Sequence, residues 1–319
     1  MTHEKTPTAG LAPGPSAGVV APRPVEQYAP LLVSPSSSPE LVAAAELPSS
    51  TGVEPISAGV LSAPVPTTHW IGCHRLDLEE CGSTNDEAAR LARAGARHGT
   101  LVVSRIQTAG RGRAGRAWTS PAGNLYMSLV LRPALLLRDV PAMTLAIGVA
   151  VCETARSLGI GATLKWPNDV LVGQRKLAGV LLESQSRGER LDVVIAGIGI
   201  NLDAPPDPSA APLATWVTRE LGRPVDREGF LARLLAAIEH WVDRYVACGL
   251  PGVIPAFTAL MDQHTRAQTR IAGQLVTGVL EGIDDVGALL LRADDGLVHR
   301  VIAGDVETVR TEAVPALTI

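Results

Sequence analysis

Hydrophobic and polar residues follow helix-like and strand-like spacings from about His69 onward. Thr84 and Glu87 have the spacing of a capping box, and the amphipathic stretch behind them stops before Gly99. This pattern predicts a helix over about 85–97, with its first turn capped by polar side chains.

Two later segments have apolar residues at helical spacing. Pro141 at a first turn opens a mainly apolar stretch that ends at Gly159, which is typical of a buried helix. An amphipathic helix is predicted from Arg227 to Val246 by the apolar residues Phe230, Leu234, Ile238, Trp241 and Tyr245.

Six segments have the β-branched or alternating composition of strands, and turn residues separate them. They are residues 100–108, 125–132, 162–166, 169–172, 176–184 and 191–200. After Gln268 the pattern changes to short alternating strands broken by glycines. The fold class is therefore α+β, a mixed β-sheet flanked by helices and followed by a small all-β barrel.

Composition divides the 319 residues into three parts. Residues 1–66 hold half of the 24 prolines, with Ser, Ala and Thr between them, and predict a disordered tail. We expect the mixed sheet domain over 67–265 and the barrel over 266–312. The tail has no pattern for an N-terminal helix-turn-helix.

A net charge of −4 argues against broad binding to nucleic acid or to an anionic membrane. The longest apolar run, around 140–152, is shorter than the ~20 residues that a spanning helix needs. We therefore expect a soluble, cytoplasmic protein. The four cysteines and seven histidines show no metal-ligand spacing. We expect the cysteines to be buried, reduced thiols.

The segment GRGRAGRAW, residues 110–118, concentrates three arginines before Trp118. Its glycines satisfy G-x-G-x-x-G, but Pro121, Gly123 and Asn124 follow where a dinucleotide-binding loop needs a helix. A solvated loop between strands is the simple interpretation. However, the arginines offer planar donors for phosphate or carboxylate and the tryptophan offers a stacking face. We favour a loop that binds an anionic, ring-bearing ligand.

A second set of polar residues lies on the predicted strand–turn–strand of KWPNDVLVGQRKLAGV. There Lys165, Asn168, Asp169 and Lys176 can converge, whereas each alone is most simply a surface residue. In GIGIN, residues 197–201, the glycines keep side chains off one strand face and Asn201 offers a donor and an acceptor.

Five motifs together resemble the biotin–protein ligases, in order and at comparable spacing. They are GSTN (82–85), QTAGRGRAGRAW (107–118), KWPNDV (165–170), KLAGVLLE (176–183) and GIGINL (197–202). AGDVETVR (303–310) is similar to that family's closing stretch. The resemblance covers about 69–310. It implies a class II synthetase-like biotinyl/lipoyl ligase domain followed by an SH3-like barrel, without an N-terminal DNA-binding domain.

The resemblance implies a two-step reaction. Biotin and ATP form biotinyl-5′-adenylate and pyrophosphate, with Mg²⁺ as the metal, and biotin is then transferred to one lysine of a biotin carboxyl carrier domain. Biotin, ATP and this carrier are the expected partners. The sequence leaves a homodimer open.

Roles for individual residues follow from the same resemblance. The expected catalytic residues are Lys176, Arg113, Asp169 and Arg116, with Lys176 bridging the two reactants and Asp169 orienting the carrier lysine. The expected biotin-binding residues are Ser83, Thr84, Asn85, Gln107, Gly110, Arg111, Arg113, Lys176, Gly179, Leu181, Gly197 and Gly199. The expected ATP- or adenylate-binding residues are Arg111, Arg113, Arg116, Trp118, Lys165, Asn168, Lys176 and Asn201. We expect Trp166 to be a packing residue, and we expect no metal bound by protein side chains alone.

Three alternatives compete with this interpretation. A lipoate-type ligase shares the fold, but the polar set Ser83, Thr84 and Gln107 suits a ureido ring better than an apolar dithiolane. A biotin-sensing repressor would need an N-terminal recognition helix. An RNA-binding protein would need more aromatic and basic residues than this chain has.

Overall fold

The computed structural model describes residues 67–187, 190–205, 209, 211–262, 265–302, 304 and 306–308. All of these residues belong to one compact unit. The tail over 1–66, for which we expect disorder, lies outside the described residues. So does part of the closing stretch 303–310.

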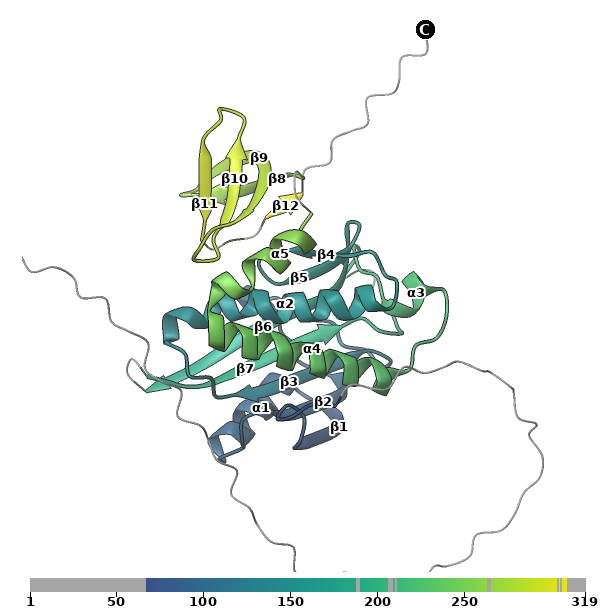
Figure 1. The fold of residues 1–319 in the computed structure, drawn as a ribbon. Coiled ribbons are helices and arrows are strands. Elements are labelled where there is room, and N and C mark those ends of the chain that lie inside the picture. The colour runs from purple at the N-terminus through teal and green to yellow at the C-terminus, as the bar shows by residue number, and fades with distance from the viewer. Residues whose placement is uncertain are drawn as a thin grey trace, which may run out of the picture. The chain divides into compact units, whose positions relative to one another are not determined.

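A seven-stranded mixed sheet forms the larger part of the described chain, as expected (Figure 1). Its strands are β1 (Arg75–Cys81), β2 (Thr100–Gln107), β3 (Leu125–Leu131), β4 (Ala162–Lys165), β5 (Asp169–Val172), β6 (Arg175–Arg187) and β7 (Arg190–Ile200). The spatial order is β1-β2-β3-β7-β6-β5-β4. β1 pairs with β2 in parallel, and the other neighbours are antiparallel.

Strand β1 was not predicted because its sequence RLDLEEC is rich in charge. It lies at the edge of the sheet, where most of its side chains are exposed. Charged residues are a common property of edge strands, since they discourage pairing with other chains. The other strand predictions differ from the structure by only a few residues.

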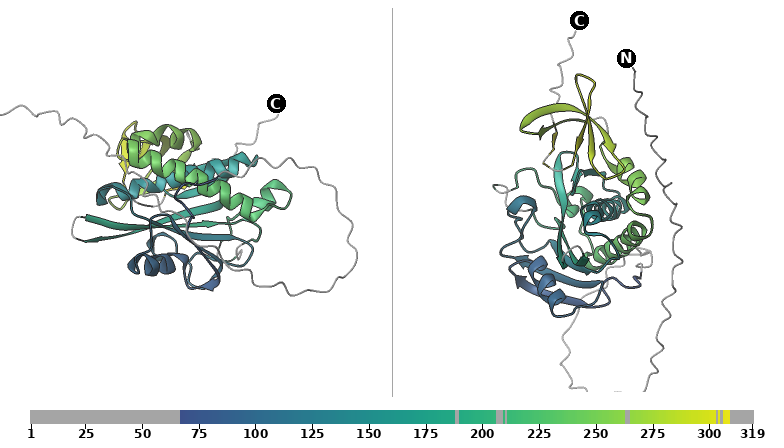
Figure 2. Two further views of the ribbon diagram at one scale, coloured as in Figure 1. Left: turned by 60° about the horizontal axis from the view of Figure 1, so that its bottom comes forward. Right: turned by 90° about the vertical axis from the view of Figure 1, so that its left-hand side faces the viewer.

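Helices cover both faces of this sheet (Figure 2). They are α1 (Thr84–Arg93), α2 (Val140–Ser157), α3 (Val217–Leu221), α4 (Arg227–Cys248) and α5 (Ile254–Leu260). α1 packs on β2, β3 and β7, while α2 packs on β4, β5 and β6 and against α4. α3 and α5 were not predicted, because five and seven residues are too few for a clear period.

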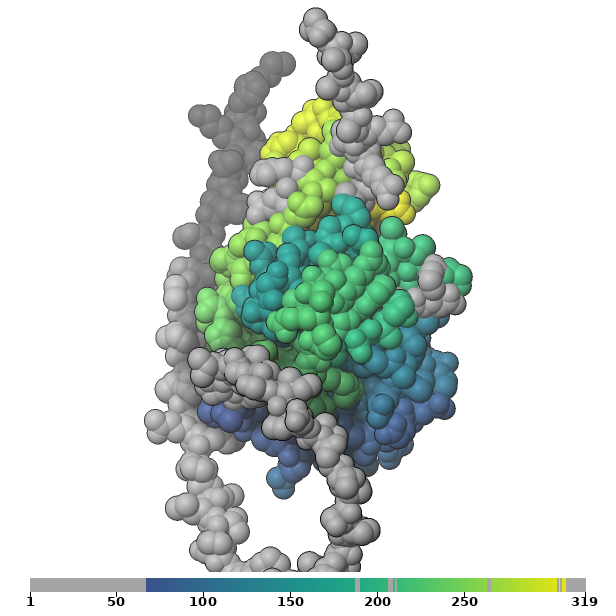
Figure 3. Space-filling view, turned by 90° about the vertical axis from the view of Figure 1, so that its right-hand side faces the viewer, coloured from purple at the N-terminus to yellow at the C-terminus, as the bar shows by residue number. Residues whose placement is uncertain are grey.

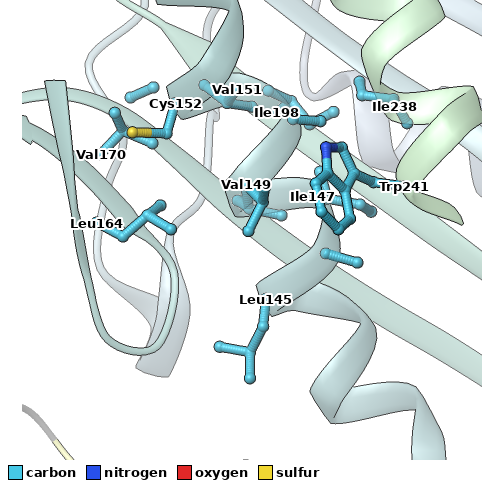
Figure 4. Packing of buried hydrophobic residues seen from close by; sticks show 14 of the residues in the cluster. Leu145, Ile147, Val149, Val151, Cys152, Leu164, Val170, Ile198, Ile238 and Trp241 are labelled. Atoms are coloured by element: carbon cyan, nitrogen blue, oxygen red, sulfur yellow. The ribbon is translucent and has the colours of Figure 1, made fainter. Parts of the chain in front are cut away.

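The main core lies between the sheet and the α2–α4 pair (Figure 4). Twelve residues of α2 are buried, as its mainly apolar composition predicts. Cys152 of α2 points toward Val170 of β5, and Trp241 of α4 lies beside Ile147. The apolar stripe predicted for α4 is buried along its whole length. This packing fixes the sheet, and with it the strand ends that carry polar residues.

The first helix is shorter than predicted. It ends at Arg93, because Gly95 adopts φ +89°, which an L side chain rarely adopts. The predicted capping box does not form. Ser83 is the N-cap residue, but its side chain makes no capping hydrogen bond. The Thr84 hydroxyl is used elsewhere, in the site described below.

The expectation for the cysteines was only partly right. All four are free thiols, but Cys73 and Cys248 are exposed, Cys81 is half-buried and only Cys152 is buried. Burial raises the pKa of the Cys152 thiol to about 12.

The strands after residue 265 form a second, five-stranded antiparallel sheet. They are β8 (Arg266–Ile271), β9 (Gln274–Ile283), β10 (Leu289–Ala293), β11 (Val298–Val301) and β12 (Glu307–Thr308). The indole Nε1 of Trp166 donates to the Gly287 carbonyl at 2.9 Å, which joins the β4–β5 turn to this sheet. Trp166 is also nearly fully buried, in agreement with its expected packing role.

Residues far apart in the sequence share one surface. In Figure 3, the blue residues near the start of the described chain lie beside the teal and green residues of later elements. None of the described helices has an apolar stretch long enough to span a bilayer.

Candidate functional site

One cavity collects nearly all of the residues singled out in the sequence. It has a volume of about 390 Å³, within the usual range for small-molecule sites. The predicted residues that line it are Ser83, Thr84, Asn85, Gln107, Arg111, Arg113, Arg116, Trp118, Lys165, Asn168, Asp169, Lys176, Gly179, Leu181, Gly197 and Gly199. They come from the start of α1, the end of β2, the β4–β5 turn, strands β6 and β7 and the segment 110–118.

The segment 110–118 is a small hairpin, which we call the arginine hairpin. Gly112 N donates to the Arg116 carbonyl at 2.7 Å, and Trp118 N donates to the Gly110 carbonyl at 2.9 Å. Its turn places Ala114 at φ 53° and Gly115 at φ 72°. No helix follows the third glycine, so the structure excludes the dinucleotide-binding geometry, as the sequence predicted.

Trp118 lies against two glycines that pair across β6 and β7. A methyl group at position 199 would come within 2.7 Å of Trp118 Cε2, and one at position 179 within 3.2 Å of Cζ3. Gly179 and Gly199 are register partners in the sheet. The glycines therefore leave the strand surface open to the indole. Trp118 Nε1 is buried and has no hydrogen-bond partner among the described residues.

Basic side chains from three elements line the cavity. Lys176 Nζ lies 2.7 Å from Asp169 Oδ1 and 5.0 Å from the centroid of the Trp118 ring. Arg113 Nη1 donates to Asn168 Oδ1 at 3.1 Å, and Asn168 Nδ2 donates to the Val180 carbonyl. Asn168 thereby holds an arginine of the hairpin against β6.

Arg116 and Lys165 complete this basic set. Arg116 Nε donates to the Arg113 carbonyl at 3.3 Å, within the arginine hairpin. Lys165 ends β4 and lines the cavity. Several cations facing one cavity favour an anionic ligand, because like charges on the wall repel each other less once an anion lies between them.

Uncharged polar side chains at the start of α1 and the end of β2 line one part of the cavity, which we call the floor: Ser83, Thr84, Asn85 and Gln107. Gln107 Oε1 accepts hydrogen bonds from Thr84 N at 2.8 Å and from the Thr84 hydroxyl at 3.1 Å. Ser128 Oγ lies 2.8 Å from Thr84 Oγ1 and 2.6 Å from Asn85 Oδ1. Gln107 Nε2 donates to Ser120 Oγ at 3.0 Å. This floor offers both donors and acceptors in fixed positions.

Two expected residues have positions that differ from the rest. Gly110 is buried and does not line the cavity, and an added methyl group there would lie 2.6 Å from the Trp118 carbonyl oxygen. Asn201 lines a neighbouring cavity of about 560 Å³ together with Trp118, Lys165 and Lys176. Its Nδ2 donates to the Lys176 carbonyl at 3.2 Å. Trp118 and the two lysines therefore face both cavities.

Arg111 contacts carboxylates. Both of its terminal nitrogens donate to Asp86 at 2.7 Å, and Nη2 lies 3.5 Å from Glu183 Oε1. The hydrogen bond from Arg111 lowers the pKa of Asp86, and Asp86 in turn raises that of Arg111. Glu183 Oε2 accepts from Asn85 Nδ2 at 2.7 Å.

Sequence reasoning missed several members of the site. Ser128 had a visible signal, since it is a polar residue within the otherwise apolar strand LYMSLVL. Asp86 had none, because a charge near a helix start is ordinary, and Glu183 appeared only as the last residue of the KLAGVLLE motif, with no role assigned to it. Glu307 of the second sheet also lines the cavity, which needed the tertiary fold to be seen. Within the described residues no three His, Cys, Asp or Glu side chains form a metal-binding group.

Known proteins share these features. A model described as the biotin/lipoate A/B protein ligase family matches residues 82–201, and one described as the biotin protein ligase C terminal domain matches residues 262–308. The biotin–[acetyl-CoA-carboxylase] ligase of Paracoccus denitrificans is 41% identical over 235 residues, which are 69% of this chain and 94% of the relative.

Two further comparisons agree. The bifunctional ligase/repressor BirA of Bacillus subtilis is 35% identical over 246 residues, 75% of each chain. The biotin protein ligase from Aquifex aeolicus in complex with biotin and ATP matches with a TM-score of 0.66 and 28% identity, over 75% of this chain and all of that one. This chain therefore belongs to the biotin/lipoate A/B protein ligase family, and within it to the biotin protein ligases.

Proposed function

We propose that this chain activates biotin with ATP to biotinyl-5′-adenylate and then transfers the biotinyl group to a lysine of a biotin carboxyl carrier domain. One observation carries the proposal. The cations Arg113, Arg116, Lys165 and Lys176 line the same cavity as the uncharged floor around Thr84 and Gln107. Relatives of known activity, which are named as biotin ligases, support it.

The first step joins two anions. A biotin carboxylate oxygen attacks the α-phosphorus of ATP, the bond to the β,γ-phosphate breaks, and pyrophosphate leaves. Cations fixed around the reacting atoms lower the repulsion and stabilise the charge that develops on the phosphoryl oxygens. Lys176 is the proposed bridge between carboxylate and α-phosphate, because it stands where the two neighbouring cavities meet.

The floor is the proposed site of the biotin rings. Ser83, Thr84 and Gln107, with Asn85 beside them, offer the paired donors and acceptors that a ureido group needs. The backbone near Gly110–Arg111 and Gly179–Leu181, with Gly197 and Gly199 on the facing strand, would follow the valerate chain. An apolar dithiolane would leave these polar groups unpaired, which disfavours a lipoate-type ligase.

The nucleotide is proposed to lie toward the second cavity. Arg113 and Arg116, which line the first cavity, would face phosphate together with Lys165, which lines both cavities. Asn201 would face the adenine end in the second cavity. Trp118, which lines both cavities, would pack against the adenylate. The arginine hairpin, when formed over this intermediate, would keep water from the mixed anhydride.

Asp169 is the proposed orienting group for the second step. The carrier amine attacks the acyl carbon, the bond to the phosphate oxygen breaks, and AMP leaves. Asp169 already contacts an ammonium group, that of Lys176. A carboxylate in this position would attract the ammonium form of the carrier lysine and accept its proton before attack.

Mg²⁺ fits this site as an ion brought in with the nucleotide. Mg²⁺ usually keeps several waters and binds through one or two carboxylates plus substrate phosphates. Glu307 is the lining carboxylate that would hold it, since Asp169, the other one, is paired with Lys176. When bound, the ion neutralises phosphate charge.

The direct test measures pyrophosphate release from biotin plus ATP, followed by mass spectrometry of a carrier domain. We expect both reactions with the unmodified protein. We expect Lys176→Ala and Arg113→Ala each to lower adenylate formation by about a hundredfold or more. Arg105→Ala removes an exposed arginine on β2 and serves as the control. Wild-type rates in both site variants would contradict the residue roles, and release with lipoate but not with biotin would contradict the proposed substrate.

A further inference from the structure

The arginine hairpin is held to the rest of the protein through Arg111. Two parallel hydrogen bonds of 2.7 Å join its guanidinium to Asp86, in the first turn of α1. This bidentate geometry fixes both the direction and the distance of the side chain. Since Arg111 pairs with Ala117 across the hairpin, the contact with Asp86 restrains both hairpin strands.

Glu183 adds a second attachment point for the same guanidinium. It lies 3.5 Å from Arg111 Nη2 and accepts a hydrogen bond from Asn85 on the cavity floor. The guanidinium thus faces two carboxylates. An incoming phosphate would have to displace one carboxylate and approach the other, which like-charge repulsion opposes.

We propose that Asp86 is a positioning residue that acts through Arg111 to hold the arginine hairpin over the cavity before any ligand binds, with Glu183 as the supporting carboxylate. In this proposal Arg111 positions the hairpin, and the other cations of the site bind the anionic ligand. The contact of Asp86 with Arg111 restrains the hairpin whether or not the proposed function is correct. The expected effect on the binding of biotin and ATP rests on the proposed function.

The size of the effect follows from exposure. The side chains of Asp86 and Arg111 are 60% and 36% exposed, so water and salt screen the pair. An ion pair of this kind favours the closed hairpin but still allows it to open. If the hairpin opens more often in the free protein, the apparent Kd of the ligand rises, because it equals the intrinsic Kd divided by the fraction of molecules in which the hairpin is closed.

Hydrogen–deuterium exchange of the full-length, ligand-free protein is the test. The amides of Gly112 and Trp118 are protected only while the hairpin is formed. We expect Asp86→Asn to speed exchange in peptides covering 108–120 by roughly three- to tenfold. Glu87→Gln is the matched control. It removes a carboxylate from the same turn of α1, but this carboxylate pairs with Arg90 and not with Arg111. It should leave those peptides unchanged, and Asp86→Glu should restore part of the protection.

A double-mutant cycle shows whether Asp86 acts through Arg111. In Asp86→Asn/Arg111→Gln, exchange should be no faster than in Arg111→Gln alone, because the same contact is already lost. Additive effects, or equal exchange in wild type and Asp86→Asn, would overturn the proposal. If Asp86→Asn speeds exchange throughout the protein, the Arg111→Gln variant alone provides the test. Wild-type exchange rates in its peptides covering 108–120 would then overturn the proposal.

Kinetics separate this role from general destabilisation. With biotin and ATP, Asp86→Asn should raise KM roughly three- to tenfold and leave kcat within about twofold, since the closed complex is unchanged. A fall in kcat with unchanged KM would contradict positioning. Absence of activity in the wild type would contradict the proposed function and leave the exchange result valid.

Discussion

At the residue scale, Trp118 and the glycines beneath it show how backbone shape prepares a site. The sequence indicated that GIGIN keeps side chains off one strand face, but it could not tell what would occupy that space. The structure places the indole against Gly179 and Gly199. Trp118, which covers the strand face at Gly199, lies about 80 residues earlier in the chain. A contact over such a sequence distance has no local signal.

We predict that Gly199→Ala slows adenylate formation without unfolding the protein. The added methyl group would lie 2.7 Å from the Cε2 and Nε1 atoms of the indole, so Trp118 must move. Displacement of a site residue by about an ångström lowers rates by roughly tenfold to a hundredfold. Pyrophosphate release measures the loss. Gly161→Ala, where an added methyl group has no neighbour within 4 Å, should behave as the wild type.

We predict that Asp169→Asn separates the two chemical steps. Adenylate formation should stay within about threefold, since Lys176 keeps its charge, whereas transfer to the carrier should fall by about a hundredfold because the orienting carboxylate is lost. Single-turnover transfer from preformed biotinyl-5′-adenylate isolates the second step. Equal losses in both steps would assign Asp169 to the positioning of Lys176.

At the element scale, the amphipathic helix α4 holds the start of the described chain. Glu239 is buried on α4 and accepts hydrogen bonds of 2.8–3.0 Å from the backbone N–H groups of His69, Trp70 and Ile71. The apolar spacing of α4 was predictable, and this carboxylate was not. A single Glu on a helix is normally solvated, and only the tertiary fold brings three donors to it.

We predict that Glu239→Gln lowers the free energy of unfolding by about 2–3 kcal/mol at neutral pH, because charged hydrogen bonds are replaced by weaker neutral ones. Denaturant unfolding measures this. Glu79→Gln, at a side chain that is 85% exposed, is the control and should change stability by less than about 0.5 kcal/mol.

The same carboxylate predicts a pH dependence. Burial raises the pKa of Glu239, but the hydrogen bonds from Ile71, Trp70 and His69 outweigh burial and lower the pKa below 4.5. A lowered folded-state pKa stabilises the protein above the unfolded-state value, and this contribution is lost as the pH falls through the folded-state value. The difference between wild type and Glu239→Gln should therefore shrink below about pH 4.5. A difference that grows with acid would contradict this.

At the scale of the whole molecule, the mixed sheet, its main helices and the small β module were predictable from period and turn residues. The edge strand β1 and the short helices α3 and α5 were not, because charge and brevity hide their periods. The site residues were found through five motifs, and nearly all of them line one cavity. The domain limits at residues 66, 265 and 312 stay predictions.

Trp166 connects the two sheets, and we predict that Trp166→Phe weakens this connection. The variant keeps an aromatic ring in the core but loses the hydrogen bond to Gly287, which should lower the free energy of unfolding by about 1 kcal/mol. Trp70→Phe removes an exposed indole contact with Asp243 and should have a smaller effect. Urea unfolding followed by circular dichroism compares them. An equal or larger effect of Trp70→Phe would contradict the connection.

The side-chain contacts beneath the cavity have a consequence for redesign. From Arg111 they run through Glu183, Asn85, Ser128, Thr84, Gln107 and Ser120 to the Trp118 carbonyl, and so link both strands of the arginine hairpin under the floor. A single apolar substitution at one of the buried members of this path, which are Asn85, Ser128, Thr84 and Ser120, leaves a polar neighbour without its partner and away from water. An engineer who wants the enzyme to accept a different carboxylic acid must therefore exchange such neighbours in matched pairs.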